Sequence, residues 1–271
     1  MIRDSGRAIA VILARGVGSR MRRGDPDAPL DPAQAAAADR GLKAMMPIAG
    51  RPLLDYLLSA LADAGFARAV LVVAPDHAAV REWYDAHPPG RIAVEYAVQA
   101  KPRGTADAVL AIESLVGGES FAVMNGDNYY PAEALRAVRD AGEPCALLFE
   151  RDALIARSNI PAERIAAFAL VTIDENGYLA SVEEKPAVVP PGNRPISMNL
   201  WRFDRAIFDA CRRAPASPRG ERELPYAVDY GIHHLGLRLR AKTLALPVLD
   251  VSQRADVANV AERLRGIDVR P

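Results

Sequence analysis

The chain has 271 residues, half of them hydrophobic and a quarter charged, which is enough apolar material for a sizeable core. Lys and Arg together number 34, as do Asp and Glu, so the formal net charge is zero. This balance argues against a nucleic-acid or membrane surface and restricts any anion site to a local cluster.

The first predicted element is a buried strand over residues 8–13, which ends in a glycine-rich basic loop containing Gly16, Gly18 and Arg20. Glycines let backbone N–H groups approach an anion closely, and an arginine adds charge and forked donors. The loop lacks the third glycine of a dinucleotide fingerprint and has no Walker lysine. It indicates a phosphate site, with an ordinary tight turn as the simpler alternative.

A long insert follows at residues 24–41, with three prolines and an alanine run. Within it, residues 32–39 are predicted to form a short helix. A long insert beside a phosphate loop fits a mobile lid and a plain surface loop equally well. Lys43 then stands in an otherwise apolar segment, where it is either a functional cation or a lysine whose stem covers apolar surface.

Strands and helices alternate through the rest of the first half. The expected strands are 70–74, 92–97, 121–124 and 145–149, and the expected helices are 53–64, 77–84, 105–115 and 131–139. Loops with polar residues and glycine follow the strand ends, as in Gln99 to Gly104 and Asn125 to Asp127. The alternation predicts an α/β fold with a doubly wound, mostly parallel sheet, Rossmann-like, whose ligands bind beyond the carboxyl ends of the strands.

The pattern changes after residue 150. Residues 153–164 are expected to be irregular, 166–173 and 178–184 to form a β-hairpin, 196–203 and 243–248 to be strands, and 204–213, 225–235 and 255–264 to be helices. No Gly/Ser- or Pro-rich linker divides the chain. We therefore predict one domain over residues 1–271, a parallel core extended by an antiparallel part.

Cysteine and histidine usage gives no metal motif. Cys145 and Cys211 lie in apolar stretches and are expected to be reduced core residues, and the four histidines lack ligand spacing. The sequence starts without a signal-peptide apolar region, and no apolar run approaches the length of a membrane span. A cytoplasmic protein is expected.

Several short motifs occur in a recognisable order. They are Leu13–Met21, Lys43–Ile48, Gln99 with Pro102–Ala108, Asn125–Asp127, Glu183–Pro186, and Asn199 with Asp250–Ser252. With these motifs the chain resembles, over nearly its whole length, the sugar-phosphate nucleotidylyltransferases, the family of glucose-1-phosphate thymidylyltransferase and ADP-glucose pyrophosphorylase. That family's reaction is attack of a sugar phosphate oxygen on the α-phosphorus of an NTP with release of pyrophosphate, which needs charge neutralisation and in-line positioning.

The resemblance implies three groups of site residues and three ligands: an NTP, a sugar 1-phosphate and Mg²⁺. Arg20, Lys43 and Asp127 are expected to be catalytic, and Asp127 with Asp250 to hold the metal. The expected nucleotide-binding residues are Leu13, Ala14, Gly16, Gly18, Ser19, Gln99, Gly104 and Thr105. The expected sugar-phosphate-binding residues are Asn125, Glu184, Lys185 and Asn199. Residues 1–150 are then the nucleotide-binding half and 151–271 the sugar-phosphate-binding half.

Two positions depart from the family pattern. Val251-Ser252 replaces the usual glycine and threonine after the aspartate, and Asn199 stands where relatives often have glycine. A non-catalytic, regulatory relative that binds nucleotide or NDP-sugar is the main alternative. A glycosyltransferase of related fold is less favoured, because Asn125-Gly126-Asp127 lacks the first carboxylate of an Asp-x-Asp metal motif. The base, the sugar phosphate and the oligomeric state, a homo-oligomer included, stay open.

Overall fold

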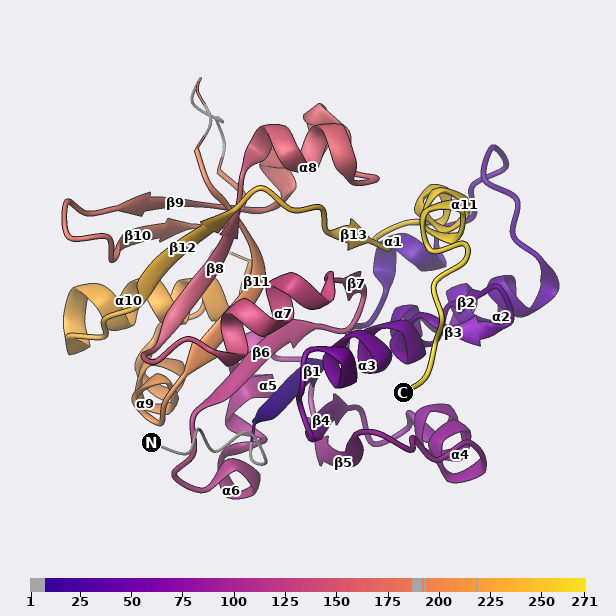
Figure 1. Cartoon of the computed structure of the whole chain (residues 1–271), viewed down its shortest axis with the longest axis horizontal. Coiled ribbons are helices and arrows are strands. Elements are labelled where there is room, and N and C mark those ends of the chain that lie inside the picture. The colour runs from indigo at the N-terminus through magenta and orange to yellow at the C-terminus, as the bar shows by residue number, and fades with distance from the viewer. Residues whose placement is uncertain (1–7, 187–191, 193, 218) are drawn as a thin grey trace.

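A twisted mixed β-sheet runs through the middle of the molecule and carries helices on both faces (Figure 1). The computed structural model describes residues 8–186, 192, 194–217 and 219–271. Four strands form the parallel part of the sheet, in the order β5-β4-β1-β6. They are β1 (Ile9–Leu13), β4 (Arg68–Val73), β5 (Ala93–Val98) and β6 (Phe121–Asn125). The predicted α/β fold with a parallel core is confirmed.

The apolar runs in these strands reflect burial on both faces. In β1, Ile9 and Val11 belong to one core cluster, whereas Ala10 and Ile12 belong to the cluster on the opposite face. Strands covered on both sides have no solvated face, so their sequences do not alternate. Leu13 is level with Asn125 of β6, which places the loops after both strands at the same edge of the sheet.

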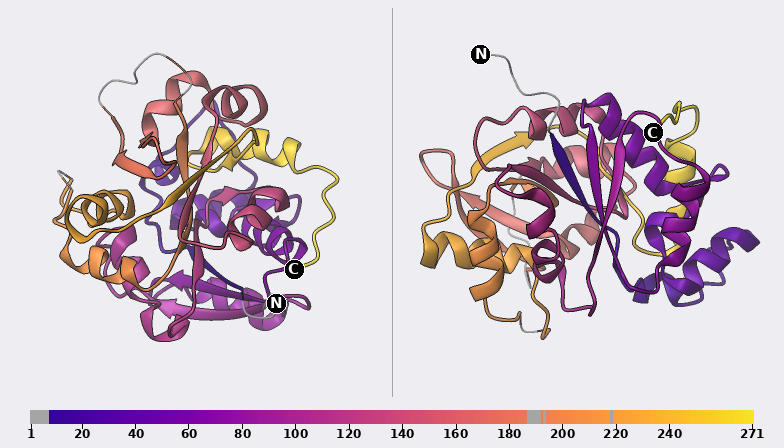
Figure 2. Two further views of the ribbon diagram at one scale, coloured as in Figure 1. Left: turned by 60° about the vertical axis from the view of Figure 1, so that its left-hand side comes forward. Right: turned by 90° about the horizontal axis from the view of Figure 1, so that it is seen from below.

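Helices cover both faces of the sheet (Figure 2). The first core cluster contains residues of α3 (Leu53–Asp63), α4 (Ala78–Ala86), α7 (Ala132–Arg139) and α8 (Arg151–Arg157). The second contains residues of α5 (Thr105–Leu110), α6 (Glu113–Val116), α9 (Ala206–Arg213) and α10 (Leu224–Leu235). The long helix expected over 105–115 is therefore two short ones, α5 and α6.

The expectation of an irregular segment at 153–164 is wrong for most of its length. Helix α8 occupies its start, and the 3₁₀ helix η2 (Ala162–Ala167) begins near its end. Each helix is anchored by a buried apolar residue, Leu154 in α8 and Ile165 in η2. One buried residue per short helix leaves too little periodicity for sequence reasoning to detect.

Strand β11 (Ile196–Phe203) joins the parallel and antiparallel parts. One of its edges pairs with β8 (Cys145–Phe149), and the other pairs with β6 at residues 201–203 and with β9 (Ala169–Ile173) at residues 196–197. The register shifts between Ser197 and Leu200, where Asn199 has a φ of +56°. Asparagine tolerates this left-handed conformation better than most side chains, which explains why it can stand where relatives often have glycine.

The remaining strands complete the antiparallel part. Strand β10 (Leu179–Glu183) forms the predicted hairpin with β9, and β12 (Arg240–Leu244) pairs in parallel with β8. The strand expected over 243–248 is misplaced, since β12 ends at Leu244. Pro247, which lacks an N–H, stands between β12 and the two-residue strand β13 (Leu249–Asp250), which pairs with β7 (Asn128–Tyr129).

A third core cluster packs the glycine-loop region against the end of the chain. Met21 of α1 (Ser19–Arg22) and Met46 share it with Val251, which follows β13, and with Val257 of the closing helix α11 (Arg254–Arg263). The region also holds η1 (Lys43–Met45), the short strands β2 (Pro47–Ile48) and β3 (Arg51–Pro52), and α2 (Pro32–Arg40). Helix α2 confirms the helix expected over 32–39, and Asp31 with Gln34 forms a capping box at its start. That residues 24–41 act as a lid stays a prediction.

Both cysteines lie in the core, as predicted. They are free and buried, and burial raises the pKa of Cys145 to about 11 and that of Cys211 to about 12. Thiols held protonated in this way are unreactive. Among the described residues, no helix has both the length and the hydropathy needed to cross a bilayer.

Candidate active site

A pocket of about 370 Å³ opens at the carboxyl ends of β1 and β6. It lies beside the place on β11 where the strand stops pairing with β6 and starts pairing with β9. Every residue that the sequence nominated lines it. They are Leu13, Ala14, Gly16, Gly18, Ser19, Arg20, Lys43, Gln99, Gly104, Thr105, Asn125, Asp127, Glu184, Lys185, Asn199 and Asp250. The sequence thus predicted which residues meet, although their separate roles stay predictions.

An ion pair between Lys43 and Asp127 lies in this pocket. The Lys43 Nζ atom is 2.9 Å from Asp127 Oδ2, and the two side chains are 19% and 26% exposed. Lys43 begins η1, whereas Asp127 follows β6 and its carbonyl accepts a hydrogen bond from Val251 N (2.9 Å). Burial acts to lower the pKa of Lys43, but the carboxylates of Asp127 and Asp250 outweigh it and raise that pKa. Lys43 is therefore a fixed cation.

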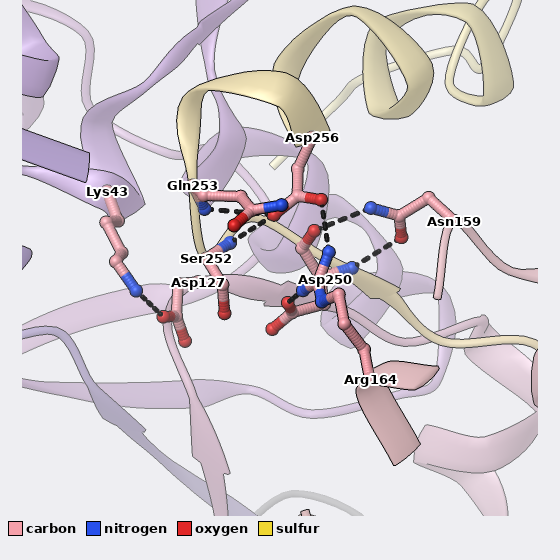
Figure 3. Close-up of polar contacts among 8 residues, drawn as sticks. All are labelled: Lys43, Asp127, Asn159, Arg164, Asp250, Ser252, Gln253 and Asp256. Carbon is pink, nitrogen blue, oxygen red and sulfur yellow. Dashed lines mark hydrogen bonds and ion pairs between the residues drawn. The ribbon is translucent and has the colours of Figure 1, made fainter. Parts of the chain in front are cut away.

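Asp250 brings a second carboxylate to the same place. It lies in β13, level with Asn128 of β7, so it does not simply follow the last long strand. Burial and the nearby charge of Asp127 raise the pKa of Asp250 to about 6, even though Arg164 is paired with it. Figure 3 shows Lys43, Asp127 and Asp250 across the site, with Arg164 beyond Asp250.

The two carboxylates fit a hard divalent cation. The negative charge of Asp127 makes ionisation of the buried Asp250 less favourable, and a cation between the two carboxylates would relieve that repulsion. In the described part of the chain no group of three or more His, Cys, Asp or Glu side chains is placed to hold a metal. Phosphate oxygens and water would have to supply the other ligands, as is usual for Mg²⁺.

The glycine loop owes its shape to a close backbone contact. Gly18 has a φ of +61°, and a Cβ built there would lie 2.6 Å from Gly41 Cα. Gly41 has a φ of +72°, and its own Cβ would lie 2.3 Å from Val17 O. Neither position can hold a larger residue without moving backbone, so the loop and the end of α2 fix one another.

Gly18→Ala is therefore expected to lower the free energy of unfolding by about 1–2 kcal/mol or more, because it adds left-handed strain and a backbone clash. Gly16→Ala is the matched control, since its φ lies outside the left-handed region and a Cβ added there would meet nothing within 4 Å. Urea denaturation of both variants measures the difference. Equal stability of the two would contradict this account of the loop.

Gln99, Gly104 and Thr105 are fixed by contacts within the protein. The buried Gln99 donates through Nε2 to Gly104 O (2.9 Å) and to Asp107 Oδ2 (3.0 Å), so its amide nitrogen is committed. Thr105 Oγ1 accepts from Leu224 N (2.7 Å), and Gly104, with a φ of +110°, leaves no room for a Cβ beside the Arg222 backbone. The contacts of Thr105 and Gly104 thus fix the loop between Gln99 and Thr105, which lines one part of the pocket.

Glu184 and Lys185 bring opposite charges to the pocket wall. Lys185 Nζ lies 3.6 Å from Glu184 Oε1, and burial raises the pKa of Glu184 and lowers that of Lys185. Lys185 and Asn199 both have positive φ, at +50° and +56°, and Asn199 Oδ1 accepts from Trp201 Nε1 (3.1 Å). Non-glycine residues held in this region are often found at functional sites.

Sequence reasoning missed two arginines at the site. Arg219 pairs with Glu223 and lies 3.9 Å from Glu184, which adds a cation next to Lys185. Arg164 lines the pocket itself and pairs with Asp250. The Arg219-Gly220 pair lies in a predicted loop, which is a sequence signal that could have identified Arg219 as a site residue. No sequence motif near Arg164 marks that residue in the same way.

Known proteins similar to this chain are nucleotidyl transferases. The nucleotidyl transferase family profile matches residues 9–241. A UTP–glucose-1-phosphate uridylyltransferase of Haloferax volcanii is 30% identical over 81% of this chain and 82% of its own length. A glucose-1-phosphate thymidylyltransferase of Streptomyces antibioticus is 27% identical over 82% of this chain and 56% of its own length. A solved UDP-glucose pyrophosphorylase bound to UDP-glucose shares the fold, with a TM-score of 0.70, 17% identity and coverage of 96% of this chain and 100% of that one.

The fold and the pocket define a nucleotide-transferring enzyme of the α/β class. The chain belongs to the nucleotidyl transferase family, whose profile covers most of its length. The resemblance drawn from the sequence motifs is confirmed.

Proposed function

We propose that this protein transfers a nucleoside monophosphate from an NTP to a sugar 1-phosphate, giving an NDP-sugar and pyrophosphate. The observation that carries the proposal is the Lys43–Asp127 ion pair beside Asp250, in a pocket that the glycine loop, Glu184 and Lys185 also line. A sugar phosphate oxygen attacks the α-phosphorus, the bond from that phosphorus to the bridging oxygen breaks, and pyrophosphate leaves with the electron pair. The family membership and the names of the curated relatives support this reaction.

The nucleotide half of the pocket is assigned to the NTP. Backbone at Leu13 and Ala14 together with Gln99 faces the base, the glycine loop and Arg20 hold the β- and γ-phosphates, and Lys43 stabilises the charge that develops at the α-phosphate. Asp127 and Asp250 are the residues that would hold Mg²⁺. When bound, Mg²⁺ neutralises phosphate charge at the reacting centre.

The other half of the pocket is assigned to the sugar phosphate. Glu184 accepts hydrogen bonds from sugar hydroxyls, and Lys185, supported by Arg219, meets the phosphate as a point charge. Asn125 and Asn199 border the same space from β6 and β11. The side chain of Asn199 already accepts from Trp201, which leaves its amide nitrogen for a ligand.

The test is pyrophosphate release in the presence of Mg²⁺, measured with UTP, dTTP, ATP, CTP and GTP in turn against a panel of sugar 1-phosphates. Clear release with one base and one sugar supports the proposal and supplies both specificities. A second assay with NDP-sugars and acceptors tests the glycosyltransferase alternative, which would release a nucleoside diphosphate from the NDP-sugar. Nucleotide binding without turnover anywhere in the grid would favour the regulatory alternative.

A further inference from the structure

Arg164 joins two buried carboxylates that lie far apart from it in the sequence. One terminal nitrogen, Nη2, donates to Asp250 Oδ2, and the other, Nη1, donates to Asp256 Oδ1. The three side chains are only 16%, 4% and 5% exposed. Such a planar, forked cation can hold two carboxylates in fixed directions at once, which a lysine ammonium cannot do with the same geometry.

Asp256 is itself an anchored partner. Its other oxygen, Oδ2, accepts from the backbone nitrogens of Ser252 and Gln253, both at 2.9 Å, at the start of α11. These bonds tie the carboxylate to the first turn of the helix, as an N-terminal capping residue does. Arg164 therefore connects Asp250 to a rigid element and not to another mobile side chain.

The segment between α8 and β9 also holds the backbone of Asp250. Asn159 Nδ2 donates to Asp250 O (2.7 Å), and Asp250 N donates to Asn159 Oδ1 (2.9 Å). Figure 3 shows Asn159 and Arg164 together around Asp250, with Asp127 on the other side. Backbone and side chain of Asp250 are thus both fixed by this one segment.

Asp250 borders the pocket, where the Ser252 side chain also hydrogen-bonds to its carboxylate. Arg164 occupies Oδ2, while the charge of Asp127 acts on the same carboxylate from the pocket side. We infer that Arg164 is a positioning residue that, through Asp256, sets the orientation in which Asp250 faces Asp127 for binding a divalent cation. The inference rests on the proposed function only in taking these two aspartates as the cation ligands.

The test is Mn²⁺ binding to the protein without nucleotide, followed by the electron paramagnetic resonance signal of free Mn²⁺. Arg164→Gln is expected to weaken Mn²⁺ binding about 10- to 100-fold, the loss typical when a partner of a metal ligand is removed. Arg164→Lys is expected to weaken it as well, since charge is kept but the bridge is lost. Simple electrostatics predicts the opposite for Arg164→Gln, because removing a cation beside Asp250 should tighten Mn²⁺ binding.

Asp256→Asn tests the second link without touching Asp250. Asp256→Asn is also expected to weaken Mn²⁺ binding. The Arg164→Gln, Asp256→Asn double variant should lose less binding free energy for Mn²⁺ than the sum of the losses in the two single variants. Arg68→Gln is the matched control. It breaks an arginine–carboxylate pair, Arg68 Nη2 to Glu95 Oε2 at 2.8 Å, and neither residue borders the pocket. Its Mn²⁺ affinity should equal that of the wild type.

Wild-type or tighter Mn²⁺ binding in Arg164→Gln would overturn the inference, and so would unchanged binding in Asp256→Asn or no Mn²⁺ binding by the wild type. Near-UV circular dichroism identifies any variant that fails to fold, in which case the remaining two variants decide. The Mn²⁺ experiment measures no turnover. If no NTP and sugar 1-phosphate pair releases pyrophosphate, the proposed function fails, but the Mn²⁺ affinities of the variants can still be interpreted.

Discussion

Lys43→Met is expected to lower kcat about 10²- to 10³-fold, which corresponds to about 3–4 kcal/mol of lost transition-state stabilisation. Lys43 is a partly buried cation whose pKa is raised by two carboxylates, so it enters the reaction charged and already in place. Methionine has a similar length and no charge, which isolates the electrostatic contribution. Steady-state pyrophosphate release with the best substrate pair is the measurement.

The effect should appear in kcat far more than in nucleotide affinity, because the charge that Lys43 opposes grows as the transition state forms. Lys242→Met is the matched control, since Lys242 lies in β12 and does not line the pocket. Turnover of Lys43→Met within about threefold of the wild type would remove Lys43 from the catalytic set.

Asp127→Asn is expected to reduce turnover by a comparable two to three orders of magnitude. The change keeps the size of the side chain but removes a charge from the proposed cation site and from the partner of Lys43. Activity should recover in part as the Mg²⁺ concentration is raised, because a weakened metal site still fills at high concentration. The Mg²⁺ dependence of the initial rate is the measurement.

Asp63→Asn serves as the control for Asp127→Asn. Asp63 also pairs with a cation, Arg91 (2.7 Å), but lies outside the pocket. An unchanged Mg²⁺ requirement in Asp127→Asn, together with normal turnover, would contradict its assignment as a metal ligand.

Features that depend on local sequence were predictable. The apolar run of β1 and the glycines after it predicted a buried strand with a phosphate-type loop, and the strand expected at Ile196–Phe203 has those bounds in the structure. The pocket residues could be named because each follows a strand end or sits in a short motif. Parallel strands finish at one edge of a sheet, so their following loops meet.

Features that depend on distant pairing were not predictable. Arg164 lies 86 residues from Asp250 and 92 from Asp256, and no local pattern links them. Asp250 itself sits in a two-residue strand whose partner, Asn128–Tyr129, is equally short, and strands of that length carry no periodicity. Such contacts are set by tertiary packing after the elements form.

Strand β11 has a consequence for exchanging substrate specificity between relatives. It follows the proposed sugar-phosphate residues Glu184 and Lys185 in the chain, yet it pairs with β6, which lies in the proposed nucleotide-binding half. At that seam Phe203 packs on Phe121 with ring centroids 6.3 Å apart, and Trp201 stacks on Phe203 at 5.8 Å. A chimera joined near residue 150 would bring in a foreign β11 and mismatch these rings. Grafts confined to the loops around β9 and β10 would alter the sugar pocket and keep the aromatic seam intact.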